Sequence, residues 1–115
     1  MDSAHLWDML EAARAVARFV GDRVFEQYLG DELLVAAVER KIEIIGEAAR
    51  KISPEFKQLH PEFSWRRIIG QRHVLAHEYG DIDPKIVWKV VKVHIPELIA
   101  LLERVVPPIP EENGK

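Results

Sequence analysis

Apolar residues recur at steps of three and four residues in four stretches of this 115-residue chain. This spacing places them on one face of an α-helix, and it predicts helices over residues 5–20, 34–52, 65–79 and 84–105. No stretch alternates apolar and polar residues in the way that a half-buried strand does. The pattern therefore predicts an all-α fold, an antiparallel four-helix bundle with a short extra helix or turn.

Residues that cap or break helices mark the ends of the first two helices. Asp2 or Ser3 is expected to cap the first helix, which should end near Gly21. The pair Ser53-Pro54 is expected to close the second helix, because the residue before a proline disfavours the helical conformation. Residues 54–64 should then form a loop that holds a short turn of helix.

The second half of the chain carries similar signals. Ser64 is expected to cap the third helix, and Gly80 is expected to follow its end in the left-handed conformation. Asp83-Pro84 combines an N-cap with a first-turn proline, which predicts the start of the fourth helix. Pro96 is expected to kink that helix, because a proline removes one backbone hydrogen bond and crowds the preceding turn.

Length and composition predict one cytoplasmic domain. We assign the helical domain to residues 1–106 and expect the proline-containing tail, residues 107–115, to be extended or disordered. The chain has no cysteine, so disulfides and thiolate metal sites are excluded. No window is apolar enough for a membrane span, and the first residues lack the layout of a signal peptide.

The formal net charge of −3 limits how this chain can bind nucleic acid. Proteins that coat DNA or RNA non-specifically present a broad positive face, which this composition does not favour. Any RNA contact should therefore come from a local basic cluster or from a surface shared between subunits. Two clusters are candidates: Arg66 and Arg67 with Arg72, and Lys85, Lys89 and Lys92.

Chemistry is concentrated between Arg72 and Tyr79. Glycine-rich phosphate loops, serine nucleophile elbows and zinc-protease motifs are all missing from the sequence. Arg72 offers a permanent cation suited to phosphate, and His77 can exchange protons near neutral pH. Together these two side chains suffice for cleavage of RNA without a metal or cofactor, in which the ribose 2′-hydroxyl attacks the adjacent phosphorus.

The spacing within this segment leaves several interpretations open. Arg72 and His77 lie about 140° apart on an ideal helix, which favours a bent helix end or a site shared by two subunits. His73 and His77 share a face and could bind zinc with a third ligand, but no candidate ligand has a recognisable spacing; the candidates are His94, His60 and Glu78. In the simplest interpretation both histidines are polar residues at the edge of a packed helix.

The same segment resembles the HepT-like proteins of the HEPN superfamily. Arg72, His77 and Tyr79 match the arginine, four residues, histidine, one residue, tyrosine motif of that family. The similarity extends from about Leu6 to Val105, and it includes the stretches around residues 44–49, 65–72, 79–83 and 87–96. The resemblance therefore covers most of the chain and not the short motif alone.

This resemblance implies an all-α, metal-independent endoribonuclease that is the toxin of a toxin–antitoxin pair. Arg72 and His77 would be catalytic, in a homodimer whose two motifs face one cleft. The partner would be a minimal nucleotidyltransferase antitoxin, which adds adenylate to Tyr79 and can assemble with the toxin into a larger hetero-oligomer. An adenylate at Tyr79 would place negative charge beside the cation that binds substrate phosphate.

Three further residues bear on the site. The residue after the motif arginine is usually asparagine in the family, whereas here it is His73, which could add an acid or base or replace a hydrogen bond. Glu47 could support Arg72 or could instead pair with Lys51, four residues later on the same helix. His94 lies on the apolar stripe of the fourth helix, where a core or interface role is expected.

Three functions are compatible with these observations. The first is the ribonuclease toxin. The second is a non-catalytic HEPN module that binds a nucleotidyltransferase or a nucleotide, as the negative net charge and His73 suggest. The third is an interaction bundle with no site, in which replacing Arg72 would have no effect.

Overall fold

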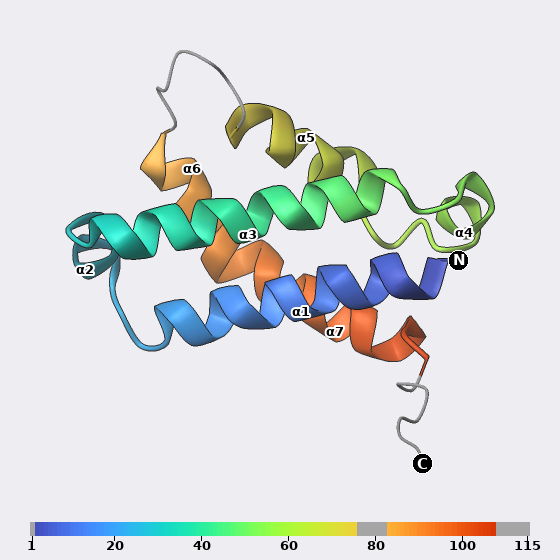
Figure 1. Cartoon of the computed structure of the whole chain (residues 1–115), viewed down its shortest axis with the longest axis horizontal. Helices are drawn as coiled ribbons and strands as arrows, with labels where there is room; N and C mark the ends of the chain where they lie inside the picture. Colours follow the sequence, from blue (N-terminus) through green and yellow to red (C-terminus); the bar gives the residue numbers. More distant parts are fainter. Residues whose placement is uncertain (1, 76–82, 108–115) are drawn as a thin grey trace.

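The computed structural model describes residues 2–75 and 83–107, with the backbone alone for residues 71–75. All regular structure in these ranges is helical, as the sequence predicts. Figure 1 shows the helices in chain order, which are α1 (Asp2–Val20), α2 (Phe25–Leu29), α3 (Glu32–Arg50), α4 (Pro54–Leu59), α5 (Trp65–Leu75), α6 (Pro84–Lys89), the π-helix η1 (Val90–His94) and α7 (Ile95–Val105). The all-α class is confirmed, while the exact four-helix arrangement stays a prediction.

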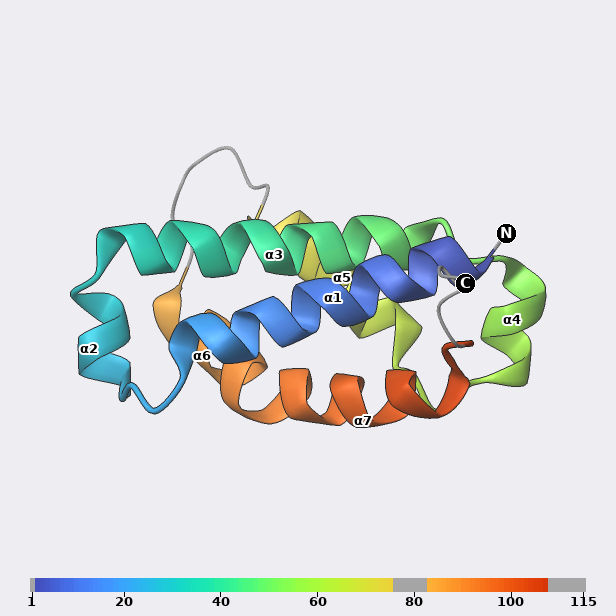
Figure 2. The same ribbon diagram turned by 60° about the horizontal axis from the view of Figure 1, so that its bottom comes forward.

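The two long helices α1 and α3 lie side by side and run in opposite directions (Figures 1 and 2). α5 packs against α3, and α7 packs against α1. The core between them is apolar, and no polar or charged residue of the described part is fully buried apart from the tyrosine Tyr28. Its most enclosed side chains come from several helices and from the loop before α5, which contributes Phe63: Tyr28, Phe63, Met9, Leu10, Ile42, Ile45, Leu102, Val16 and Val38.

Most helix ends lie where the sequence places them. α1 ends before Gly21, whose φ of +54° favours glycine. The Asp31 carboxylate accepts a hydrogen bond from the backbone N–H of Leu34 and caps α3. Asp83 caps α6 in the same way, through the N–H of Lys85, with Pro84 in the first turn as predicted.

The predicted cap of α1 is wrong. Asp2 and Ser3 both lie inside the helix, which begins at Asp2. The Asp2 carboxylate instead accepts hydrogen bonds from the backbone N–H and the hydroxyl of Ser53, at 2.9 and 2.7 Å. Asp2 therefore ties the start of α1 to the turn between α3 and α4, because two donors at that turn compete successfully with the amides of its own helix.

The loop over residues 54–64 holds one short helix, α4, as predicted. The hydroxyl of Ser53 caps it by accepting from the N–H of Phe56. α2 is a second short helix that the sequence pattern does not predict, because five residues are too few to show a period. Its buried residue is Tyr28, whose ring lies 5.1 Å from that of Trp88 between centroids.

Pro96 alters the fourth helix in a specific way. The five residues before Ile95 form a π-helix, and the N–H of Ile95 donates to the carbonyl of Val90, five residues earlier. Because Pro96 has no N–H and crowds the preceding turn, the wider π-turn accommodates its ring. Figure 2 shows the direction of the chain changing between α6 and α7, so the predicted kink takes the form of a π-helical segment.

None of the described helices is both long and apolar enough to cross a lipid bilayer. The tail that follows residue 107 lies outside the described residues, as do residues 76–82.

Candidate functional site

The last turn of α5 carries the first part of the predicted motif. α5 begins at Trp65, after Ser64, whose carbonyl accepts from the N–H of Ile68. The backbone is helical through Leu75, which places Arg72 and His73 within the helix as predicted. Their side chains, the whole of His77, Tyr79 and Gly80, and the predicted helix end all lie outside the described residues.

The start of α5 is held firmly against the rest of the molecule. The indole N–H of Trp65 donates to the carbonyl of His60 at 3.0 Å, and the rings of Trp65 and Phe63 stack at 4.8 Å. Ile68 is only 3% exposed and joins the core. Arg72 lies one helical turn after this anchored residue, so the backbone that carries it is fixed by packing on α3.

Glu47 lies on α3, the helix against which α5 packs, and its side chain is half-buried. It forms no ion pair with Lys51, which is exposed. The predicted pairing of Glu47 with Lys51 on the surface of α3 is therefore absent. Support of Arg72 stays a prediction, and the shared packing of α3 and α5 is compatible with it.

The other histidines that were considered as metal ligands have different roles in the structure. His60 lies 3.0 Å from Glu62 through Nδ1 and stacks on the ring of Phe56. His94 is half-buried, with Nδ1 3.5 Å from the carboxylate of Glu97. Within residues 2–70 and 83–107, no three side chains of metal-binding type gather into a cluster.

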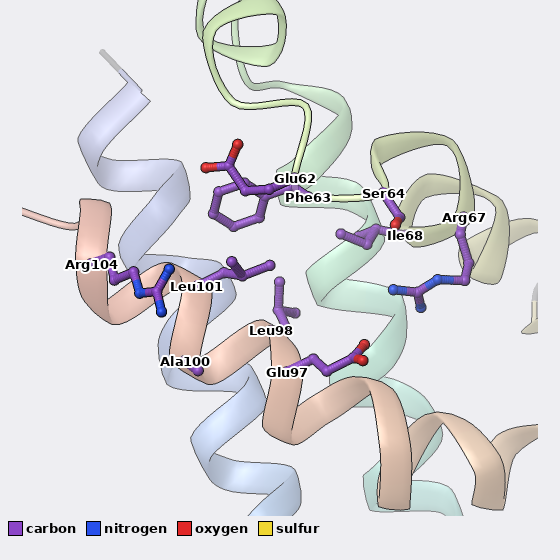
Figure 3. A pocket seen from close by; sticks show the side chains of 10 residues that line it. All are labelled: Glu62, Phe63, Ser64, Arg67, Ile68, Glu97, Leu98, Ala100, Leu101 and Arg104. Carbon is purple, nitrogen blue, oxygen red and sulfur yellow. The ribbon is translucent and has the colours of Figure 1, made fainter.

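The cation Arg67, part of the first predicted basic cluster, lies in a groove of mixed charge. The groove has a volume of about 390 Å³ and lies between the start of α5 and α7. Figure 3 shows apolar side chains along it, with Arg67 and Arg104 accompanied by two carboxylates, Glu62 and Glu97. Two acids beside two cations do not favour a polyanion, so this groove is a poor candidate for holding RNA.

The second predicted basic cluster is more exposed to solvent than Arg67. Lys85, Lys89 and Lys92 are all exposed on α6 and η1. The ammonium group of Lys92 lies 5.5 Å from the centroid of the Trp88 ring, in a cation–π contact. No carboxylate of the described part lies within ion-pair distance of the three ammonium groups.

A buried polar group that the sequence analysis does not single out lies close to Trp88. Tyr28 is fully buried, and its hydroxyl has no hydrogen-bond partner among the described residues. Burial, with a smaller contribution from the charge of Glu39, raises the pKa of Tyr28 to about 12. Burial also raises the pKa of the Glu39 carboxyl. Only the tertiary packing of α2 reveals this group, because nothing in the local sequence marks it.

Comparison with known proteins identifies the family. The model of the family described as "Ribonuclease HepT-like" matches residues 9–105, which include the whole motif and Glu47. The "Probable ribonuclease HepT" of Thermococcus cleftensis is 40% identical over 100 residues, which cover 87% of this chain and 91% of that protein. The "Putative RNase MJ1380" of Methanocaldococcus jannaschii is 37% identical over 95 residues, covering 83% and 87% of the two chains. No solved structure matches.

The match of the family model over most of the chain confirms the resemblance inferred from the motif and the flanking sequence. The chain therefore belongs to the HepT-like ribonuclease family.

Proposed function

We propose that this protein is a metal-independent endoribonuclease and the toxin of a toxin–antitoxin pair. The observation that carries the proposal is the match of the HepT-like ribonuclease family over residues 9–105, which contain Arg72, His77 and Tyr79 in the spacing of the family motif. The relatives named as ribonucleases support the same activity.

The reaction is a transesterification at phosphorus. A base removes the proton of a ribose 2′-hydroxyl, the freed oxygen forms a bond to the adjacent phosphorus, and the bond from phosphorus to the 5′-oxygen breaks. A proton from an acid goes to the departing 5′-oxygen, which leaves a 2′,3′-cyclic phosphate and a 5′-hydroxyl. Arg72 stabilises the charge that builds on the non-bridging oxygens, and His77 serves as the acid or the base.

The test measures RNA cleavage with a chelator present. We expect Arg72→Ala and His77→Ala each to reduce the rate by at least about a hundredfold, as the loss of a transition-state contact or an acid/base group does. The exposed Arg18 of α1 and His94 supply the matched controls: Arg18→Ala and His94→Ala should retain the wild-type rate. Inactivity of the wild type, or full activity of His77→Ala, would contradict the proposal and favour the non-catalytic binding module.

Arg72 and His77 do not share a face of an ideal helix, and of the two explanations, a bent helix end or a site shared by two subunits, we propose the second. If the two groups act together across a dimer, mixing the inactive Arg72→Ala and His77→Ala proteins should restore activity. In a freely exchanging mixture half of the dimers are mixed and each has one complete site, so about a quarter of the wild-type rate is expected. A mixture that stays inactive while subunits exchange would place both groups in one subunit.

The proposed partner is a minimal nucleotidyltransferase that adds adenylate to Tyr79. Co-expression of the two proteins followed by intact-mass measurement should show the mass of one added adenylate per chain and loss of ribonuclease activity. Tyr79→Phe should show neither change. Adenylate on Tyr79 would add negative charge seven residues from Arg72, which is a direct electrostatic reason for loss of phosphate binding.

His73 is the residue that departs from the family pattern, so its replacement tests whether this copy has an altered site. His73→Asn introduces the residue that is usual in the family. If His73 contributes an acid or base, the variant should change the pH profile of the rate. If it only replaces a hydrogen bond, the profile should keep its shape.

A further inference from the structure

We infer that the lysine stripe formed by Lys85, Lys89 and Lys92 holds the phosphate backbone of single-stranded RNA beside the catalytic motif. The inference rests on the proposed ribonuclease function, and it adds the surface that receives the substrate. Three observations carry it: the local charge, the exposure of the three lysines and their distance along the chain from the motif.

The charge of the chain is unevenly distributed. Residues 84–96 contain three lysines and no aspartate or glutamate, so this segment carries a charge of +3. Because the whole chain carries −3, the other 102 residues carry −6. A polyanion that approaches the protein is therefore repelled by most of the chain and attracted to this segment.

The lysine stripe occupies the exposed face of a continuous helical segment. Lys85, Lys89 and Lys92 are spaced by four and three residues, and the opposite face is buried through Val87, Val90, Val91 and Ile95. Seven residues of helix span about 10 Å, which matches about three nucleotides at a rise of 3.4 Å each. The stripe can thus contact successive phosphates of one strand.

Several other cations of the described surface lie beside carboxylates. Arg14 pairs with Glu103 at 2.9 Å, and Arg40 pairs with Glu43 at 3.2 Å. Arg67 and Arg104 share their groove with Glu62 and Glu97 (Figure 3). Within the described part, no carboxylate forms an ion pair with the lysine stripe; Asp83, which precedes it, accepts from the backbone N–H of Lys85 as the cap of α6. The ammonium group of Lys92 contacts the ring of Trp88.

The stripe also lies within reach of the motif. Lys85 follows Tyr79 by six residues, so even a fully extended chain separates their Cα atoms by no more than about 20 Å. A strand that leaves the motif therefore reaches Lys85 within at most about six nucleotides. We expect the lysine stripe to contact phosphates outside the scissile dinucleotide, and so to contribute to cleavage of long substrates and not to cleavage of a dinucleotide.

The test compares two triple variants that remove the same charge. In the first, Lys85, Lys89 and Lys92 are changed to Gln; in the control, the other three described lysines, Lys41, Lys51 and Lys57, are changed to Gln. Binding of a 20-nucleotide RNA is measured by fluorescence anisotropy at several salt concentrations, with His77→Ala in all proteins to prevent cleavage. Circular dichroism confirms that each variant is helical.

We expect the stripe variant to bind the RNA at least about tenfold more weakly. The slope of log affinity against log salt concentration should become shallower by about two, because each of three phosphate contacts contributes about 0.7 to that slope. The control variant should keep most of the affinity and slope. With His77 restored, kcat/KM of the stripe variant should fall for the 20-mer and stay unchanged for a dinucleotide.

Other results would overturn the inference. Equal weakening by both triple variants would show that only net charge matters, and an unchanged salt slope in the stripe variant would show that the lysines do not contact phosphate. A stripe variant that binds and cleaves RNA normally but fails to capture the nucleotidyltransferase would reassign the surface to a protein partner. A wild-type protein that neither binds nor cleaves RNA would refute the proposed function together with this inference, whereas the three preceding results leave that function intact.

Discussion

Replacing Tyr28 with Phe should stabilise this protein, although Tyr28 is among its most deeply buried residues. The ring is fully enclosed and packs on Trp88, and both features are retained by phenylalanine. The hydroxyl is buried without a partner among the described residues. Folding therefore removes it from water without compensation, at a cost of about 1–3 kcal/mol.

The magnitude follows from two opposed contributions. Removing the hydroxyl recovers the desolvation cost but leaves a void of roughly 12 Å³. At about 24 cal/mol per Å³ of cavity, this void costs about 0.3 kcal/mol. The net gain at neutral pH should be about 1 kcal/mol or more, which corresponds to a rise in Tm of about 4 °C for a domain of this size. Urea and thermal unfolding of the two proteins measure the difference directly.

The pH dependence supplies an independent check. The pKa of Tyr28 is raised to about 12 in the folded protein, so folding favours the neutral hydroxyl over the ionised one. The stability that comes from this preference is fully present below pH 10 and is lost as the pH rises from 10 towards 12. Tyr28→Phe does not have this loss, so its advantage should grow by about 1.4 kcal/mol per pH unit within that window. Tyr79 is present in both proteins, so its ionisation affects both alike.

Tyr28→Ala serves as the control, since it removes the ring as well and should cost about 3–5 kcal/mol. Destabilisation by Tyr28→Phe, or an advantage that does not grow above pH 10, would refute the reasoning. The first result would mean that the hydroxyl is hydrogen-bonded in the folded protein, and the second that folding does not disfavour its ionised form.

Three further predictions concern the fold. Ser53→Ala removes the cap of α4 and a donor to Asp2, and urea unfolding should show a loss of about 1–2 kcal/mol. Asp2→Asn should cost about 1 kcal/mol of unfolding free energy at pH 7 after solvent screening. Hydrogen bonds from Ser53 lower the pKa of Asp2, so the contribution of Asp2 is present above pH 3.8 and is lost as the pH falls through the lowered pKa. The stabilities of wild type and variant should therefore converge in acid. Leu102→Ala empties a fully buried position of α7 and should cost about 2–5 kcal/mol in thermal or urea unfolding, whereas the exposed Ala100→Ser should change stability little.

The sequence predicts the long helices because their signals are local and repeated. Gly21 and the Asp83-Pro84 pair each act within one helical turn, so their effects can be predicted without knowing the fold. Asp2 shows the limit of this reasoning: its preferred donors belong to Ser53, 51 residues away, and only the fold brings them together. α2 is not predicted because its five residues are too few to show a period, and its one buried residue, Tyr28, packs on Trp88 of α6.

The candidate site, like the fold, can be predicted only in part from the local sequence. Chemistry alone could nominate Arg72 and His77, but their angular separation on a helix argued against a simple shared site. The family relationship supplied the motif, and the structure adds that Arg72 lies on a helix anchored by Trp65 and Ile68. How the two side chains meet depends on tertiary packing and, in the proposed dimer, on a second subunit, which no local pattern in one chain encodes.

Net charge illustrates why a whole-chain property can mislead about a local function. A charge of −3 correctly argues against a protein that coats RNA over a broad face, because most of the surface would repel the strand. It does not argue against a nuclease, since only a few phosphates of the substrate must be held, and the proposed lysine stripe of residues 84–96 would hold about three of them. Repulsion from the remaining acidic surface would then favour release of the cleaved strand. A weak, strongly salt-dependent affinity combined with efficient turnover is therefore the behaviour that this charge distribution predicts.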